Sequence, residues 1–180
     1  MHTTPEDNET NSSRSMGVTM FILAWAVLII MGIVFFDDLL ADQHNPNHNP
    51  ASRTTQEGIK EVILQSNRQH HYIANGLING YKTVFLLDTG ATDVVIPQSL
   101  AKKIGLKANG RQQAYTANGR VTVYKTKLNT LQLGDIELQN INASINPAMD
   151  KDTVLLGMSA LKQIEFTQRG ETLILRQYDD

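Results

Sequence analysis

Apolar and polar residues follow two different patterns along this chain. Residues 15–36 include no charged side chain, and 18–36 is almost entirely apolar. A stretch of this length crosses a hydrocarbon core of roughly 30 Å as a single helix. From about Gly58 onward, short apolar runs are separated by turn residues, which is typical of β-strands. The pattern therefore predicts one transmembrane helix, residues 15–36, ahead of an all-β domain, residues 58–180.

Two other interpretations of the apolar stretch are weaker. A signal peptide has an apolar region of roughly 7–15 residues, shorter than this one, and a small-residue cleavage site after it. The residues that follow here, Asp37-Asp38-Leu39-Leu40-Ala41, contain no Ala-x-Ala site. A buried core helix is disfavoured because no polar face interrupts the apolar residues. An uncleaved membrane anchor is the favoured interpretation.

The charges beside the apolar stretch indicate its orientation. Arg14 is the one basic side chain before it, while Asp37, Asp38 and Asp42 follow it with no Lys or Arg nearby. Lys and Arg near the ends of a span favour the cytoplasmic side. We therefore expect a single-pass protein of the inner (cell) membrane with its N-terminus in the cytoplasm. The β domain would then be periplasmic if the protein is bacterial.

Polar segments flank the predicted helix on both sides. Residues 1–14 are acidic and rich in Asn, Thr and Ser, which predicts a disordered cytoplasmic tail. Residues 37–57 include the polar run Gln-His-Asn-Pro-Asn-His-Asn-Pro, which predicts a flexible linker. His44 and His48 have the i, i+4 spacing of a helical metal pair, but Pro46 between them is incompatible with a helix interior. We expect no metal site there.

Turn and breaker residues divide the β domain into short elements. Asn79-Gly80 between two apolar runs is a strong signal of a two-residue hairpin. Short helices are predicted at residues 97–104, with Pro at the start and Gly just past the end, and at residues 158–163. Further strands are expected at residues 112–116, 120–130, 135–138, 143–145, 154–156, 165–168 and 172–175. Many short strands with two short helices predict a compact β-barrel-like domain.

Composition removes several classes of function. The net charge is −2 and the chain has no run of Lys and Arg, so a nucleic-acid partner is not expected. The absence of cysteine excludes disulfides, thiol catalysis and cysteine-based zinc sites. We expect neither a metal nor a cofactor.

One motif carries the candidate chemistry. The apolar run Phe85-Leu86-Leu87 leads directly into Asp88-Thr89-Gly90-Ala91-Thr92, and Asp-Thr-Gly occurs once in the chain. Carboxylates are rarely buried unless something pairs with them or uses them. A turn aspartate that merely caps backbone amides is the bland alternative. The apolar lead-in and the glycine turn favour a functional carboxylate at Asp88.

This motif and a second one resemble the retropepsin-type aspartic proteases. Residues 86–92, followed by Val94-Val95-Ile96, resemble the active-site strand of that family. Leu155-Leu156-Gly157, which begins 67 residues after Asp88, resembles the family's second element, two apolar residues and a glycine before a helix. The resemblance covers residues 61–176, and within it Asn79-Gly80 and the segment 116–119 resemble the bacterial membrane-anchored members of the family. It implies a single-lobed acid protease fold, a closed β-barrel with two short helices, and an aspartic endopeptidase acting on peptide or protein substrates.

The chemistry of this class requires two carboxylates. They lie about 3 Å apart and share one proton, so that one acts as a base on water while the other polarises the scissile carbonyl. Two like charges this close cannot both ionise. Because this chain carries one Asp-Thr-Gly motif, the economical second carboxylate is Asp88 of another copy across a twofold axis. We therefore expect a homodimer.

The resemblance also implies roles for neighbouring residues. Thr89 would hydrogen-bond across the dimer axis, and Gly90 would permit the tight turn. The family usually has Asp-Thr-Gly-Ala-Asp, whereas Thr92 and then Asp93 stand here, so the substrate-binding role of that last aspartate does not transfer directly. Thr92 either donates a hydrogen bond near the carboxylate or supports the turn. The residues expected to support the active-site loop are Thr89, Gly90, Ala91, Thr92, Leu155, Leu156 and Gly157.

A glycine-tipped hairpin is the expected flap over the substrate. Residues 113–121 contain an Asn-Gly tip between two strands, a form suited to closing over a cleft and excluding water. The predicted flap and substrate-binding residues are Tyr115, Thr116, Ala117, Asn118 and Gly119. A second interpretation of the whole domain is a catalytically silent module that binds peptides or partner proteins. The intact Asp-Thr-Gly favours the enzyme, because a binding module has no need for two mutually repelling carboxylates.

Overall fold

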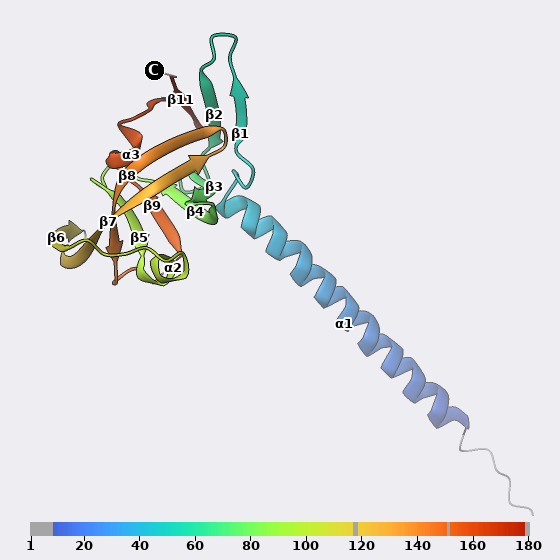
Figure 1. Ribbon diagram of the computed structural model, residues 1–180. Coiled ribbons are helices and arrows are strands. Elements are labelled where there is room, and N and C mark those ends of the chain that lie inside the picture. The colour runs from blue at the N-terminus through green and yellow to red at the C-terminus, as the bar shows by residue number, and fades with distance from the viewer. Residues whose placement is uncertain (1–8, 117–118, 151, 179–180) are drawn as a thin grey trace, which may run out of the picture. The chain divides into compact units, whose positions relative to one another are not determined.

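The computed structural model describes residues 9–116, 119–150 and 152–178 and shows two compact units that divide between Ala41 and Asp42 (Figure 1). The first unit contains most of α1 (Glu9–His44). Residues 16–36 of this helix are long and apolar enough to cross a membrane, and none of them is buried. A segment with these properties serves either as a membrane span or as an N-terminal signal sequence.

Helix α1 is longer than the predicted span at both ends. It begins at Glu9, inside the segment predicted to be a disordered tail, of which residues 1–8 lie outside the described residues. It continues to His44 because residues 37–44 contain neither Gly nor Pro. Pro46 then stops it, since proline disfavours helical geometry at the residue before it and removes a backbone donor.

The segment expected to be a flexible linker is largely structured in its second half. The side chain of Asn47 is 4% exposed and makes three hydrogen bonds. Its Nδ2 donates to the carbonyl oxygens of Gln65 (2.9 Å) and Ile73 (2.7 Å), and its Oδ1 accepts the Gln65 N–H (2.8 Å). A short strand, β1 (Ala51–Thr54), follows. The sequence did not reveal this, because polar residues that bond to distant backbone look the same as solvated ones.

Eleven strands of the described chain form two sheets. After β1, the strands are β2 (Lys60–Gln65), β3 (Ile73–Ile78), β4 (Tyr81–Leu87), β5 (Val94–Pro97), β6 (Arg111–Thr116), β7 (Gly119–Leu133), β8 (Ile136–Asn146), β9 (Thr153–Leu156), β10 (Glu165–Arg169) and β11 (Thr172–Gln177). The larger sheet has the order β3-β4-β9-β5-β8-β7-β6, and the smaller one β1-β2-β11-β10. Two further helices lie between strands, α2 (Gln98–Lys103) and α3 (Met158–Leu161).

The larger sheet turns back on itself. Strand β3 also pairs with β7, through Leu77 opposite Gln132 and Ile78 opposite Leu131, while β6 lies beyond this ring of six strands. Strands β4 and β9 pair in parallel, so their C-terminal ends lie side by side. Strands β5 and β8 are also parallel. The all-β, barrel-like prediction with two short helices is confirmed for this part of the chain.

The hairpin between β3 and β4 is confirmed at the predicted residues. Asn79 and Gly80 have φ angles of 49° and 81°, the left-handed values that a two-residue turn of this type requires. The predicted separate strands 135–138 and 143–145 are instead one strand, β8. It runs through its polar centre because it pairs with β7 on both sides of Asn140, whose own side chain is exposed.

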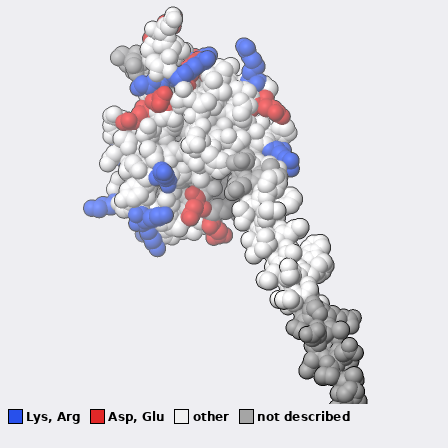
Figure 2. All heavy atoms as spheres, turned by 90° about the vertical axis from the view of Figure 1, so that its right-hand side faces the viewer, with Lys and Arg blue, Asp and Glu red and all other residues white. Residues whose placement is uncertain are grey.

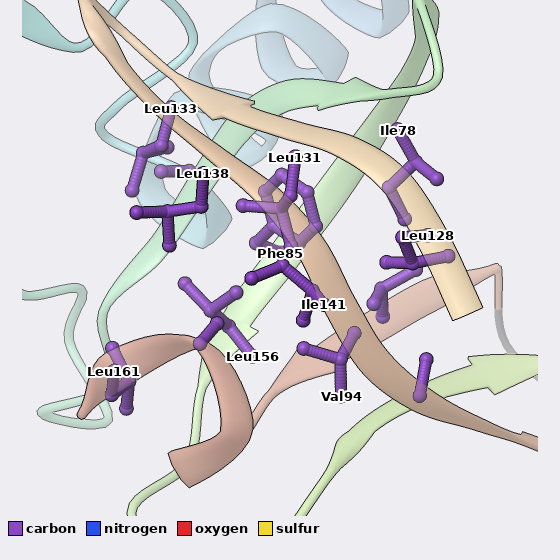
Figure 3. Close-up of a cluster of buried hydrophobic side chains, with 14 of the residues drawn as sticks. Ile78, Phe85, Val94, Leu128, Leu131, Leu133, Leu138, Ile141, Leu156 and Leu161 are labelled. Carbon is purple, nitrogen blue, oxygen red and sulfur yellow. The ribbon is translucent and has the colours of Figure 1, made fainter. Parts of the chain in front are cut away.

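Both sheets contribute to a single apolar core. Figure 3 shows its centre, where side chains from β3, β4, β7, β8 and β9 gather, among them the fully buried Phe85. Val62 and Leu175 of the smaller sheet belong to the same cluster. Fully burying each large apolar side chain contributes roughly 1.5–3 kcal/mol. The two sheets therefore form one domain.

An ion-pair network ties the smaller sheet together. Glu61 on β2, whose side chain is 4% exposed, accepts hydrogen bonds from Arg53 of β1 and from Arg176 of β11 (2.6 Å). Arg176 also pairs with Glu165 of β10 over 3.1 Å, and Tyr178 donates its hydroxyl to the same carboxylate over 2.6 Å. These contacts join all four strands by their side chains as well as by their backbones.

Candidate active site

Strand β4 delivers Asp88 to the end of the barrel. Its core residue Phe85 is fully buried, and its last residue, Leu87, pairs in parallel with Leu156 of β9. The backbone N–H of Asp88 then donates to the carbonyl oxygen of Leu156 over 3.1 Å. The two motifs noted in the sequence, Asp-Thr-Gly and Leu-Leu-Gly, are therefore neighbours in space.

The turn after β4 holds the carboxylate in place. The N–H of Gly90 donates to Oδ1 of Asp88 over 2.9 Å, and the N–H of Ala91 donates to the Asp88 carbonyl oxygen over 3.2 Å. A Cβ at position 90 would lie 3.1 Å from that same Oδ1, so a larger residue would press on the carboxylate. Asp88 is half-buried, while Thr89 and Gly90 are exposed. One carboxylate oxygen is thus oriented by the turn itself.

The second motif lies under this turn. The N–H groups of Met158 and Ser159 donate to the carbonyl oxygens of Ala91 (2.8 Å) and Thr92 (2.9 Å). Gly157 is buried, and a Cβ there would overlap the backbone of the Asp88 loop. Leu156 is buried in the core, whereas Leu155 is half-buried and faces the site. The structure therefore brings the predicted support residues of both motifs together.

Ser159 is a supporting residue that sequence reasoning missed. Its hydroxyl accepts the N–H of Val94 (2.9 Å) and donates to the carbonyl oxygen of Asn142 (2.7 Å), so it joins α3 to β5 and β8. The side chain is 8% exposed. No local signal distinguishes such a serine, because its partners lie 65 and 17 residues away in the chain.

A hollow of about 730 Å³ opens beside Asp88. Its walls come from the Asp88 loop, β5, β6, β7, β8 and β9. The lining residues are Asp88, Gly90, Ala91, Thr92, Asp93, Val95, Gln112, Gln113, Ala114, Tyr115, Val123, Ser144, Asn146 and Leu155. The amide side chains among them were not predicted as site residues, and Gln112 Nε2 lies 3.4 Å from Oδ2 of Asp93.

The hairpin predicted as a flap forms one wall of this hollow. Strands β6 and β7 pair from Arg111 to the end of β6, where Thr116 is opposite Gly119. Tyr115 is 76% exposed, and the Arg120 guanidinium lies 5.1 Å from the centre of its ring. The tip residues Ala117 and Asn118 lie outside the described residues. Tyr115 is therefore at the site, on the open side of the hollow.

Charge and metal ligands give little further chemistry in the described part of the chain. No group of three or more His, Asp or Glu side chains there is placed to hold a metal ion. Figure 2 shows one face of the molecule, on which basic and acidic side chains are interspersed.

Comparison with known proteins agrees with this geometry. The family described as gag-polyprotein putative aspartyl protease matches residues 74–163. The crystal structure of a retropepsin-like aspartic protease from Rickettsia conorii is 30% identical, with a TM-score of 0.57, and the match covers 72% of this chain and 96% of that one. The fold is thus that of retropepsin-like proteins. The chain belongs to the retropepsin-like aspartic protease family.

Two further relatives are similar in sequence and uncharacterised. One is encoded in the cobV 5′ region of a Sinorhizobium species and is 35% identical over 127 residues, which is 68% of this chain and 54% of that protein. The other, from Rickettsia prowazekii, is 28% identical over 162 residues, 86% of this chain and 69% of that protein. The chain thus matches only about half the length of the first relative.

Proposed function

We propose that this protein is a membrane-anchored aspartic endopeptidase that acts as a homodimer. The observation that carries the proposal is the position of Asp88. Its carboxylate lies at the edge of a hollow of about 730 Å³ and is oriented by the Gly90 N–H, and each chain supplies one such group. A hollow of this size accommodates a stretch of peptide, since ligand sites typically measure about 300–1,000 Å³.

The proposed reaction uses the two Asp88 carboxylates with one shared proton. The ionised carboxylate takes a proton from a water molecule as the water oxygen attacks the scissile carbonyl carbon. The protonated carboxyl gives its proton to the carbonyl oxygen. The tetrahedral diol then collapses: the carboxyl that took the water's proton gives it to the amide nitrogen, one diol hydroxyl gives its proton to the other carboxylate, and the C–N bond breaks. The two carboxyls return to the state that shares one proton.

The other site residues have supporting roles in this proposal. Thr89 is exposed next to Asp88, in a position suited to contact the second copy. Gly90, Ala91, Thr92, Leu155, Leu156 and Gly157 hold the loop through the contacts described above. Tyr115, Thr116 and Gly119 belong to the hairpin that would close over the bound peptide. Closure would exclude water other than the reacting molecule.

Residues 16–36 would hold both copies in one membrane. Arg14 on the N-terminal side and the acidic residues after Phe36 favour a cytoplasmic N-terminus and a periplasmic protease domain. Confinement to a membrane raises the effective concentration of the protomers. Assembly of the active dimer would then depend on the anchor.

Cleavage of a peptide library by the full chain in detergent micelles tests the enzymatic proposal. Wild type should cleave and bind a statine-type inhibitor, whereas Asp88→Asn and Asp88→Ala should lose at least about 10³-fold in rate with the fold intact. Asp135→Asn, on an exposed turn, is the matched control and should retain activity. Equal proteolysis by wild type and Asp88→Ala would contradict the proposal. Specific peptide binding without cleavage by wild type would favour a silent binding module.

The role of the anchor has its own test. A chain of residues 42–180 keeps Asn47 and β1, which the structure packs on the barrel. Its specific activity should rise with concentration, while that of the full chain in vesicles should not. A concentration-independent activity of residues 42–180 would argue against an anchor-assisted dimer.

A further inference from the structure

Four asparagines, Asn45, Asn47, Asn67 and Asn75, fasten the segment after α1 to the barrel, and we call them the asparagine lock. Asn45, Asn47 and Asn67 are 4%, 4% and 7% exposed. Nδ2 of Asn45 donates to Oδ1 of Asn75 over 2.9 Å, and Oδ1 of Asn45 accepts the N–H of Asn47 over 3.0 Å. The N–H of Asn75 donates in turn to the Asn47 carbonyl oxygen over 3.1 Å. Because releasing the segment would leave these buried amides unpaired, it is a fixed part of the β domain.

The asparagine lock also holds His44, the last residue of α1. Nδ2 of Asn67 donates to the carbonyl oxygen of His44 over 3.1 Å. Oδ1 of the same side chain accepts the N–H groups of Gln69 (2.9 Å) and His71 (3.0 Å), which closes the loop of residues 67–71. The chain from His44 onward therefore has a defined place on the barrel, beside this loop.

The loop of residues 67–71 lies at the same end of the β3–β4 hairpin as Asp88. The loop comes just before β3 and Asp88 comes just after β4, so the two antiparallel strands bring them to one end. The N–H of Leu87, the last residue of β4, donates to the carbonyl oxygen of Tyr72, which follows the loop, over 3.0 Å. The turn of the hairpin lies at the other end, about 20 Å away, because β3 has six residues. His44 is therefore held at the Asp88 end of the domain.

The connection from the apolar stretch to this point is short. Phe36 ends the apolar stretch, and His44 follows eight residues later. Eight residues rise about 12 Å as a helix, and even a fully extended chain of this length spans about 29 Å at most. In the anchored protein, His44 thus stays within this distance of the membrane surface. The Asp88 end of the hairpin stays with it.

We infer that the natural substrates are proteins anchored in the same membrane, cut in the extended segment beside their own membrane span. The inference rests on the membrane-anchored endopeptidase proposed above and names the substrate class of that site. A segment next to a span is confined to the same layer as the Asp88 hollow, so its effective concentration there exceeds that of a segment on a long tether. An extended segment covers about 29 Å in about nine residues. Once the residues bound in the hollow are added, cleavage is expected within about 15 residues of a span.

Two reporters with one membrane span each test the substrate class. Both carry one cleavage sequence, selected from the peptide library, at about 10 or about 50 residues from the span in a flexible Gly-Ser segment on the side of the β domain. Because effective concentration falls roughly as the −3/2 power of tether length, the full chain in vesicles should cut the shorter reporter about tenfold faster. Equal rates on the two reporters would overturn the inference.

A flexible insertion in the enzyme isolates the effect of the short connection. About 40 Gly and Ser residues inserted after Asp42 keep the asparagine lock and lengthen the connection to the membrane. The ratio of the two reporter rates should then fall to about twofold, while the rate on a soluble peptide stays that of wild type. The same residues added ahead of Met1 are the matched control and should keep the larger ratio. An unchanged ratio after the Asp42 insertion would contradict the inference.

The distance to the membrane can be measured without any activity. The natural chain has no cysteine, so His71→Cys in the loop and Tyr81→Cys at the turn of the hairpin, both at exposed positions, each take one dye. In Asp88→Ala chains reconstituted in vesicles, energy transfer to acceptor-labelled lipid head groups should be stronger from His71→Cys. Equal transfer from the two positions, or stronger transfer from Tyr81→Cys, would show that the Asp88 end is not held at the membrane and would overturn the inference.

Failure of the inference is distinct from failure of the proposed enzyme. Cleavage of the soluble peptide by wild type but not by Asp88→Ala, with equal rates on the two reporters, would reject the substrate class and leave the enzyme in place. No cleavage of the peptide or of either reporter by wild type would reject the enzyme, and the substrate class with it.

Discussion

Gly157 lies directly against the backbone of Asp93, so closely that a Cβ at position 157 would overlap the Asp93 carbonyl oxygen. The same Cβ would lie 2.7 Å from the carbonyl oxygen of Ala91. Both neighbours are backbone atoms of the loop that carries Asp88, and backbone cannot move aside as the end of a flexible side chain does. Position 157 therefore accepts only glycine while the loop keeps its present conformation.

Gly157→Ala should displace the Asp88 loop and destabilise the domain. Overpacking of this kind costs about 1–3 kcal/mol, and more where backbone must shift. Thermal unfolding of the full chain in detergent measures the loss, and the Asp88 turn should show faster amide exchange. Gly32→Ala in α1 is the matched control, because a Cβ there meets nothing within 4 Å. An unchanged melting temperature for Gly157→Ala would show that the Asp88 loop can shift to accommodate the added Cβ without loss of stability.

Ser159→Ala should destabilise the domain because it leaves the buried backbone N–H of Val94 without a hydrogen-bond acceptor. Its hydroxyl is the acceptor for the buried Val94 N–H, and alanine leaves that donor unsatisfied. The expected loss is about 1–3 kcal/mol by denaturant unfolding. Ser99→Ala removes a hydroxyl that bonds Asp152 on the exposed surface and should cost less than about 0.5 kcal/mol. Equal effects of the two substitutions would refute the structural role of Ser159.

Asn47→Ala should release the chain segment before β1 from the barrel. Three hydrogen bonds to Gln65 and Ile73 disappear together, and the Gln65 N–H loses its acceptor. Hydrogen exchange should accelerate at Gln65 and in β1, with a stability loss of about 1–3 kcal/mol. Asn49→Ala, at an exposed position in the same segment, should leave exchange unchanged. Wild-type protection of Gln65 in Asn47→Ala would contradict this prediction.

Glu61 should make the domain sensitive to acid. The guanidinium of Arg176, and then that of Arg53, lower the pKa of Glu61 below its ordinary value of 4.5. A carboxyl whose pKa is lower in the folded than in the unfolded state stabilises the fold above the unfolded pKa, and this contribution is lost as pH falls through the folded pKa. The melting temperature of wild type should therefore fall as the pH drops below about 4.5.

Glu61→Gln isolates this contribution. The variant should melt below wild type at pH 7, and the difference should shrink as the pH is lowered from 5 to 3. Glu57→Gln, which removes an exposed carboxylate from the loop between β1 and β2, controls for the change in net charge. A difference between wild type and Glu61→Gln that stays constant over this range would rule out the linkage.

The sequence was most informative where local chemistry decides the structure. Asn79-Gly80 gave the hairpin because few other residues adopt left-handed φ angles at both positions. Asp88 and Gly157 could be singled out because each belongs to a short motif with fixed neighbours. Helix α2 was predicted within one residue at each end, since Pro97 and Gly105 flank it.

The parts that were missed depend on contacts between distant residues. Asn47 looks like a linker residue until Gln65 and Ile73 lie beside it. Strand β1 has only four residues, and its partner β2 defines it. Gln112 and Asn146 reach the hollow only because β6, β7 and β8 are neighbours in the larger sheet. No local pattern of apolar and polar residues contains this information.

In the membrane-anchored arrangement proposed above, the segment that Asn47 holds against the barrel has a consequence for release of the β domain from the membrane. A cut within β1 would create two new chain ends, and both would stay on the barrel. The part after the cut belongs to the domain and pairs with β2, and the part before the cut is held through Asn47. The carbonyl oxygen of His44 also accepts a hydrogen bond from the Asn67 side chain, so a single cut that releases the domain must fall before His44, within the helical residues 37–43. Because a protease cleft of this kind takes its substrate as an extended strand, the end of α1 would have to unwind first. The intact helix would thus protect the membrane-anchored form from cleavage at this point, whether by another copy of this protein or by other proteases.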